Sequence, residues 1–143
     1  MNVKYIKLFL RLALSSAFLS AVADRLGYWP DELSAWGNWE AFEAYTQSIN
    51  PWFPKSTIPI VAIVATVLEV LFALLLLVGF KTELIAKLSG LLLLLFALAI
   101  SIAYNVKGAF DYSVYSAAAA AFALSTIHSK YLELDSYLSS SKE

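Results

Sequence analysis

IPIVAIVATVLEVLFALLLLVGF, residues 58–80, is the stretch of sequence that decides the fold. A helix needs about 20 residues to cross a hydrocarbon core about 30 Å thick, and this stretch is long enough. The chain shows no repeated alternation of polar and apolar residues of the kind that indicates strands. A helix also satisfies its own backbone hydrogen bonds within lipid. The stretch therefore predicts a membrane-spanning helix.

The composition of the whole chain indicates the same setting. Of its 143 residues, 60% are hydrophobic and 15% are charged, whereas soluble domains have about 45–50% and about 25%. Because three further apolar stretches accompany the first, the sequence predicts an all-α, integral membrane four-helix bundle in a single domain. We expect spans at about 6–23, 58–80, 84–103 and 112–128, an outer loop over 24–57 and a polar tail over 129–143.

The first span also resembles a secretory signal peptide. Basic residues precede an apolar run that ends in Ala21-Val22-Ala23, a pattern that signal peptidase accepts. Against cleavage, small residues recur every fourth position on one helix face, at Ala13, Ala17 and Ala21. Because such faces let membrane helices pack closely, we favour a retained helix.

The distribution of lysine and arginine predicts the orientation. Seven of these residues lie in the amino-terminal segment, the 79–87 turn and the carboxy-terminal tail, and three lie on the other side of the predicted spans. Positive charge is commoner on the cytoplasmic side. The sequence therefore predicts a multi-pass protein of the inner cell membrane with both termini in the cytoplasm.

The outer loop is rich in tryptophan. It carries all the tryptophans of the chain, which are Trp29, Trp36, Trp39 and Trp52. Indole rings partition to the membrane–water boundary, so the loop is expected to lie on the bilayer. Within it, Asn38 is a typical helix cap and Asn50-Pro51 a typical helix end. This short interfacial amphipathic helix would anchor the ends of two spans or, alternatively, form a lid over a cavity.

Several classes of function are excluded by residues that are absent or rare. The chain has no cysteine, which excludes disulfide exchange, iron–sulfur ligation and covalent haem attachment. Its single histidine, His128, excludes a multi-histidine zinc site and is predicted to belong to an interfacial cluster. A net charge of −1 provides no basic field for nucleic acid. We therefore expect no metal site and no intrinsic cofactor.

Glu69 is the acidic residue placed deepest in the predicted hydrocarbon region. An ionised carboxylate there costs about 3 kcal/mol, so protonation, a polar cavity or a basic partner must compensate. At about 1.5 Å per residue, Glu69 lies about 16 Å and Arg11 about 8 Å from the cytoplasmic ends of their helices, a gap that two extended side chains can span. Glu69 and Arg11 are thus candidates for an intramembrane proton-exchanging or ligand-anchoring site, or for an ion pair that fixes helix register.

A second candidate site is a polar mouth on the outer face. Polar and aromatic residues border the outer ends of the predicted spans, and they could converge beneath the tryptophan-rich loop. The alternative is that they are ordinary helix terminators at an interface. The mouth candidates are Asp24, Arg25, Trp39, Asn105, Asp111 and Tyr112.

The order of these features resembles the DoxX family of small bacterial membrane proteins. The resemblance rests on Arg11 early in the first span, on residues 68–80 (LEVLFALLLLVGF) and on Ser89-Gly90-Leu91-Leu92. It implies a four-helix membrane bundle with the Arg and Glu of the family motif at Arg11 and Glu69. Relatives include the DoxD subunit of thiosulfate:quinone oxidoreductase, which implies a link to quinone or sulfur redox chemistry.

Three functions follow as hypotheses. The first is an accessory membrane subunit of a quinone-linked oxidoreductase, with Glu69 and Arg11 near a bound quinone and a redox protein as partner. The second is a membrane scaffold or assembly factor that binds other membrane proteins or a second copy of the chain through small-residue faces such as residues 117–121. The third is a small carrier for a hydrophobic or acidic molecule. A thiol mechanism is excluded by the absence of cysteine.

Overall fold

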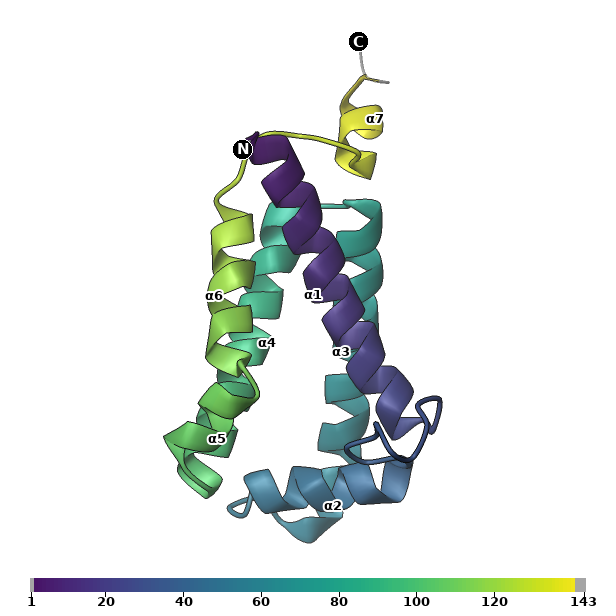
Figure 1. Cartoon of the computed structure of the whole chain (residues 1–143), viewed down its shortest axis with the longest axis vertical. Coiled ribbons are helices and arrows are strands. Elements are labelled where there is room, and N and C mark those ends of the chain that lie inside the picture. Colours follow the sequence, from purple (N-terminus) through teal and green to yellow (C-terminus); the bar gives the residue numbers. More distant parts are fainter. Residues whose placement is uncertain (1, 141–143) are drawn as a thin grey trace.

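A computed structural model describes residues 2–140 of the chain, with side chains as far as residue 138 (Figure 1). Within that range the protein is all-helical and contains no strand. The elements are α1 (Val3–Arg25), α2 (Trp39–Ile49), η1 (Lys55–Thr57), α3 (Ile58–Val78), α4 (Thr82–Ala103), α5 (Val106–Asp111), α6 (Val114–Ser125) and α7 (Leu134–Ser140).

Three of the helices are long and apolar enough to cross a membrane. They are Val3–Arg25, Lys55–Val78, which joins η1 to α3, and Thr82–Ala103. The fourth apolar stretch forms α6, which has 12 residues and is shorter than the expected span over 112–128. Ser113 adopts a left-handed backbone (φ 56°) that separates α6 from α5, and α6 ends at Ser125.

The three long helices and the shorter α6 are arranged as two pairs. α1 packs against α3, and α4 packs most extensively against α6. The start of α1 and α7 lie at one end of the molecule, which we call the terminal end, and α2 lies across the opposite end, which we call the α2 end (Figure 1). The two pairs lie close together toward the terminal end and diverge toward α2 (Figure 1).

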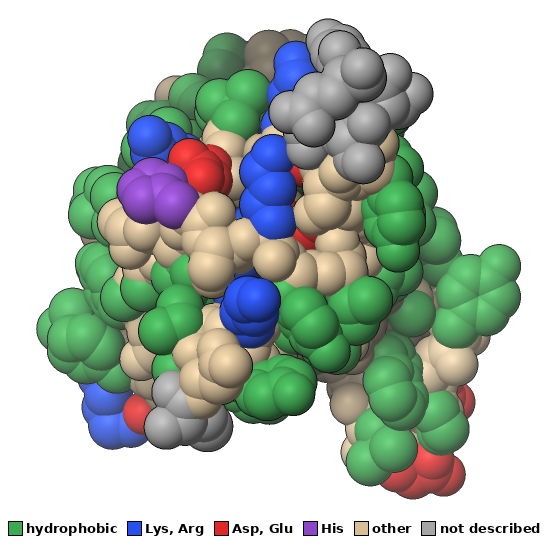
Figure 2. Space-filling model, turned by 90° about the horizontal axis from the view of Figure 1, so that it is seen from above, with side chains coloured by type: hydrophobic (Ala, Val, Ile, Leu, Met, Phe, Trp, Pro, Cys, Tyr) green, Lys and Arg blue, Asp and Glu red, His purple; other side chains and the backbone are tan. Residues whose placement is uncertain are grey.

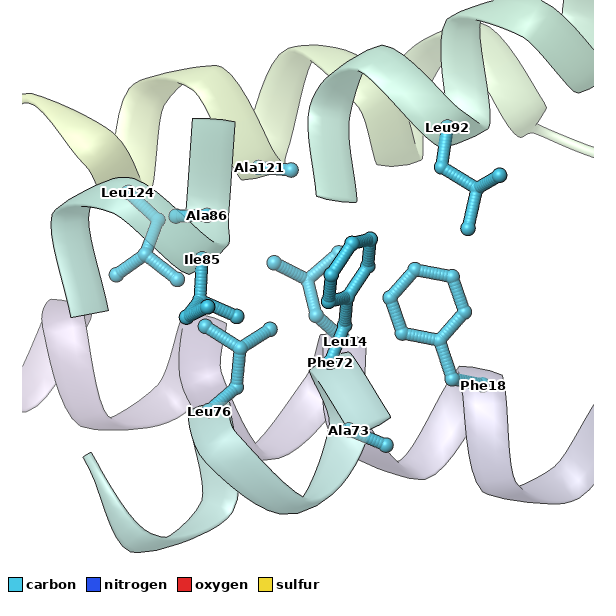
Figure 3. Close-up of a cluster of buried hydrophobic side chains, with 10 residues drawn as sticks. All are labelled: Leu14, Phe18, Phe72, Ala73, Leu76, Ile85, Ala86, Leu92, Ala121 and Leu124. Carbon is cyan, nitrogen blue, oxygen red and sulfur yellow. The ribbon is translucent and has the colours of Figure 1, made fainter. Parts of the chain in front are cut away.

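The main apolar core lies in the terminal half of the molecule. Phe18 and Phe72 bring α1 and α3 together there, and Leu92 of α4 approaches the same pair (Figure 3). Close helix approach depends on small residues, because a Cβ at Gly90 of α4 would lie 2.8 Å from the Phe122 ring of α6. Since lipid gives apolar helices little hydrophobic reason to associate, this close packing holds the pairs together.

Helix α2 begins where the sequence predicts. Asn38 is extended and its side-chain oxygen accepts a hydrogen bond from the Ala41 N–H (2.8 Å). Phe42, Thr46 and Ile49 are buried on one face of the helix. Ile49 joins a small core with residues of α4 and α5. The apolar face of α2 therefore packs on the protein and covers the end of the diverging helices.

Candidate functional site

A cavity of about 1520 Å³ occupies the space between the diverging helix pairs. Phe18 of α1, Leu68 of α3 and Phe96 of α4 line it, and α2 contributes Phe42 and Tyr45 at its end. Other side chains of α3 and α4 that line the cavity are well exposed to solvent, such as Ile60 (63%), Leu95 (64%) and Ile102 (70%). The cavity is therefore mostly apolar and open to the side of the molecule.

The charged centre of this cavity is an ion pair between Arg25 and Glu69. Arg25 Nη1 lies 2.6 Å from Glu69 Oε2, and both side chains are almost completely buried. Both residues line the cavity. This result corrects the pairing considered from the sequence, in which Arg11 was the nearest candidate partner of Glu69. The basic partner instead comes from the last residue of α1.

Arg25 is held by neighbours from three elements. Its Nε donates to the Ala21 carbonyl (3.1 Å) and its Nη1 donates to Thr66 Oγ1 (2.8 Å). The guanidinium carbon lies 3.8 Å from the centre of the Phe42 ring and 5.4 Å from that of Trp36. Aromatic faces attract cations, most strongly where water is excluded. We call Arg25, Glu69, Thr66, Phe42 and Trp36 the Arg25 cluster.

The cluster leaves hydrogen-bonding capacity unused. Arg25 Nη2 and Glu69 Oε1 make no hydrogen bond to any residue that the structure describes. An N–H donor and a carboxylate acceptor thus stand beside each other at the wall of an apolar cavity. Such a pair can bind a polar group that both accepts and donates a hydrogen bond, whereas the cavity suits the apolar remainder of the same molecule.

Asp24 fixes the loop before α2. Its carboxylate accepts hydrogen bonds from the Ser34 hydroxyl, from the Ala35 N–H (2.8 Å) and from the Gly37 N–H (3.2 Å). Gly37 has a left-handed backbone (φ 72°). Asp24 lines the cavity, but these three donors occupy its carboxylate. Its role is to hold Trp36 of the same loop over Arg25.

The remaining mouth candidates do not converge on the Arg25–Glu69 pair, although the Trp39 ring packs against the Phe42 ring of the cluster, with centroids 5.6 Å apart. Tyr112 lines the cavity and is exposed, whereas Trp39, Asn105 and Asp111 are not among the residues that line it. Trp39 Nε1 donates to Glu43 Oε1 (2.7 Å), and Asn105 caps α5 by accepting from the Gly108 N–H (2.9 Å). Asp111 forms an exposed ion pair with Lys107 (2.6 Å). The predicted mouth therefore reduces to Asp24, Arg25 and Tyr112.

Arg11 lies in the N-terminal half of α1 and binds the backbone. It donates to the carbonyls of Leu76 (2.8 Å) and Leu77 (2.9 Å) at the end of α3, and to those of Tyr131 (3.0 Å) and Leu132 (2.9 Å) in the chain before α7. The side chain is 1% exposed. Arg11 therefore joins three segments and does not contribute to the cavity.

The segment before α7 is docked rather than a simple polar extension. Glu133 is 2% exposed and its Oε1 lies 2.8 Å from Lys7 Nζ and 3.8 Å from Arg11 Nη1. Gly79 provides the space, since a Cβ at this position would lie 2.7 Å from both Arg11 Nη2 and Glu133 Cα. We call Arg11, Lys7, Glu133 and the four bound carbonyls the Arg11 cluster.

His128 also lies at the terminal end. Its Nδ1 is 2.9 Å from Glu83 Oε1, and both side chains are exposed. Figure 2, a view onto this end, shows the histidine next to an acidic side chain. His128 is thus part of a surface pair far from the cavity. Within residues 2–140, no group of three or more His, Cys, Asp or Glu side chains could hold a metal ion.

Sequence reasoning missed Thr66, Trp36 and Phe42 as partners of Arg25. The spacing of Thr66 and Glu69 carried a signal, because residues three apart share a helix face. The partners in α2 and its preceding loop could not be found in this way, since their position depends on how the loop folds back over the helix ends.

The fold and the buried polar clusters define a small, all-helical integral membrane protein. A DoxX family model matches residues 6–104, which is most of the chain, and the chain belongs to the DoxX family. The match extends from α1 to the end of α4 and includes Arg11, Arg25 and Glu69. Comparisons with curated proteins and with solved structures found no match.

Proposed function

We propose that this DoxX protein binds a quinone or quinol in its cavity, as the membrane subunit of a quinone-linked oxidoreductase. The observation that carries the proposal is the Arg25–Glu69 pair at the wall of the apolar cavity. The bound quinone would supply the redox chemistry, for which the chain itself has neither thiols nor a metal-binding group within residues 2–140.

The chemistry of the cavity fits such a ligand. A quinol oxygen can accept from Arg25 Nη2 while its hydroxyl donates to Glu69 Oε1, because neither atom has a hydrogen-bond partner among the described residues. Ligand pockets are typically about 300–1,000 Å³, so a cavity of about 1520 Å³ can hold a headgroup and part of an isoprenoid tail. The lateral opening lets a lipophilic molecule enter from the bilayer.

The membrane arrangement belongs to the same proposal. Helices α1, α3, α4 and α6 form a four-helix bundle that crosses the inner membrane, and the terminal end faces the cytoplasm. The excess of lysine and arginine in the amino-terminal segment, the 79–87 turn and the carboxy-terminal tail supports this orientation. The Arg25 cluster then lies toward the outer side of the membrane, beneath the tryptophan-rich loop.

The test is the lipophile that accompanies the full-length protein when it is extracted gently from its own membrane. We expect native mass spectrometry and solvent extraction to find a quinone or quinol on the wild-type chain and far less on Glu69→Gln. Glu83→Gln is the matched control, because Glu83 pairs with His128 on the surface of the terminal end. Absence of quinone from the wild type, or equal amounts on both variants, would contradict the proposal.

A second candidate function is a membrane scaffold. Ser116, Ala119 and Ala123 form an exposed line of small residues along α6, and such lines let membrane helices approach closely. The same mass measurement separates the candidates, because a scaffold would retain protein partners or a second copy in fixed ratio and no quinone.

A further inference from the structure

A second pocket lies at the terminal end, where α4 begins. It has a volume of about 260 Å³ and is separate in its lining residues from the cavity of the Arg25 cluster. The residues that line it come from α1, from the start of α4 and from the chain around α7, and they are Lys7, Lys81, Thr82, Glu83, Leu84, Lys130, Glu133 and Asp135.

The first turn of α4 presents unused backbone donors to this pocket. Lys81 precedes the helix with a left-handed backbone (φ 45°), and its side chain makes no capping hydrogen bond. The first N–H of the turn with a backbone partner is that of Ile85, which bonds to the Lys81 carbonyl (3.0 Å). The start of a long helix with free N–H groups attracts anions.

Thr82 provides an independent observation. Its side chain is 2% exposed and lines the pocket. Its Oγ1 is buried and has no hydrogen-bond partner among the described residues. A buried hydroxyl without a partner is costly, so a ligand in the pocket that accepts a hydrogen bond would remove this cost.

Two of the ammonium groups around the pocket are available to an anion. Three of the lining residues are lysines and three are acidic, but two carboxylates already have partners, since Glu133 contacts Lys7 and Glu83 contacts His128. The third carboxylate, that of Asp135, also has an interaction partner. Lys81 and Lys130, by contrast, form no ion pair with any described residue. Figure 2 shows lysine and arginine side chains gathered near the middle of this end.

We infer that this pocket binds a phosphate group through the first turn of α4, the Thr82 hydroxyl and the ammonium groups of Lys81 and Lys130. Phosphate oxygens accept several hydrogen bonds at once, and backbone N–H, hydroxyl and ammonium donors are the groups that recognise them. The phosphate can belong to the headgroup of an anionic phospholipid or to a free ion. The terminal end of three apolar helices is where headgroups lie.

The experiment measures binding to the full-length protein in a neutral detergent. Phosphatidylglycerol, phosphatidylcholine and inorganic phosphate are each titrated, with native mass spectrometry for the lipids and competition for the free ion. We expect phosphatidylglycerol to bind in a one-to-one ratio and more tightly than phosphatidylcholine. Competition by millimolar inorganic phosphate would assign the site to the free ion as well, whereas no competition assigns it to the lipid.

Two variants test the residues. Thr82→Val and Lys130→Gln are each expected to weaken phosphatidylglycerol binding by about 10- to 100-fold, the effect of one hydrogen bond to a charged group. Their matched controls, Thr126→Val and Lys87→Gln, change the same residue types near the same end but outside the pocket, and should have no effect. Thermal unfolding shows whether Thr82→Val still folds, and Lys130→Gln carries the test if it does not.

Two results would overturn the inference. One is that neither phosphatidylglycerol nor inorganic phosphate binds the wild-type protein. The other is that the pocket variants and their controls bind equally well. Because the quinone content of the Arg25 cavity is measured separately, failure of either proposal leaves the other intact.

Discussion

The two ends of the molecule use the same side chain on the same helix in different ways. Arg11 and Arg25 both belong to α1 and both are almost fully buried. Arg11 donates to backbone carbonyls alone in its hydrogen bonds, whereas Arg25 contacts a carboxylate, a hydroxyl and two aromatic rings. The terminal end is closed around Arg11, and the α2 end has a cavity beside Arg25.

This difference separates an arginine that holds segments together from one that our proposal assigns to ligand binding. A guanidinium whose donors end on four carbonyls from two segments has little left to offer a ligand. A guanidinium that faces side chains beside a cavity keeps a donor available, and its surroundings can change when a ligand binds. Arg11, which the family resemblance places in the motif, therefore joins segments of the structure, and the proposed binding role falls on Arg25.

The largest effect is expected at the terminal end. Arg11→Met removes the side-chain donor of the carbonyls of Leu77, Tyr131 and Leu132. It also removes one of the two donors of the Leu76 carbonyl, which still accepts from the Gly79 N–H (3.2 Å). Each buried unsatisfied group costs about 1–3 kcal/mol, so the variant should lose at least about 3 kcal/mol of stability and accumulate poorly. Thermal unfolding in detergent checks this, with exposed Leu12→Met as control. A stable Arg11→Met protein would remove the structural role.

The next largest effect is expected at the Arg25–Glu69 ion pair of the α2 end. Arg25→Met and Glu69→Met each leave one charge buried without its partner, which costs about 3–5 kcal/mol. The double variant should cost less than the sum of the two by about 1–3 kcal/mol, because it leaves no charge behind. A double-mutant cycle of unfolding free energies measures this coupling. Additive losses would show that the pair contributes nothing.

A smaller effect is expected at the turn between α3 and α4. Gly79→Ala would place a Cβ 2.7 Å from Arg11 Nη2 at a residue with φ 72°. We expect a loss of about 1–3 kcal/mol from the crowding. Gly108→Ala is the control, since the nearest atom to its Cβ would be 3.5 Å away and alanine favours a helix by up to about 1 kcal/mol. If Gly79→Ala and the wild-type protein have equal melting temperatures, the Arg11 cluster can move aside for the added Cβ.

The smallest expected effect is a pH dependence of the unfolding free energy that arises from Tyr45 at the α2 end. Burial raises the pKa of the Tyr45 hydroxyl to about 12, with Tyr112 and Tyr104 adding to the shift. An unfolded tyrosine loses its proton near pH 10, so above about pH 10 the unfolded state binds fewer protons and stability falls as the pH rises toward 12. Unfolding free energies across that range should fall less steeply in Tyr45→Phe. Identical slopes would show that Tyr45 is not buried in solution.

Much of the fold could be predicted from the sequence because its signals are local. The apolar runs give the long helices, and Asn38 begins α2 as a side-chain cap. Glu69 could be singled out because a carboxylate within an apolar run requires compensation. The length of α6 could not be predicted, since the left-handed residue Ser113 delays its start and the helix ends at Ser125, before the end of the expected span.

The partner of Glu69 could not be predicted from depth alone. Side chains on a helix tilt toward its N-terminus, and α1 and α3 run in opposite directions (Figure 1). Arg25 and Glu69 therefore lean toward each other, whereas Arg11 leans away from Glu69 toward the terminal end. A comparison of how deep the Cα atoms lie in the membrane omits the direction of the side chains, which is why it favoured Arg11.

The Arg11 cluster also has a consequence for biosynthesis. Arg11 and its partner carbonyl at Tyr131 are 120 residues apart in the chain. At about 5–20 residues per second, the ribosome needs roughly 6–24 s to cover that distance. Throughout this interval the guanidinium lacks the carbonyls that complete its bonding, and for its later part α1 and α3 are already made. The bundle can therefore be completed only after nearly the whole chain has been translated, so a stalled or truncated product that ends before Tyr131 would carry a recognisable defect, a cation left without its final partners.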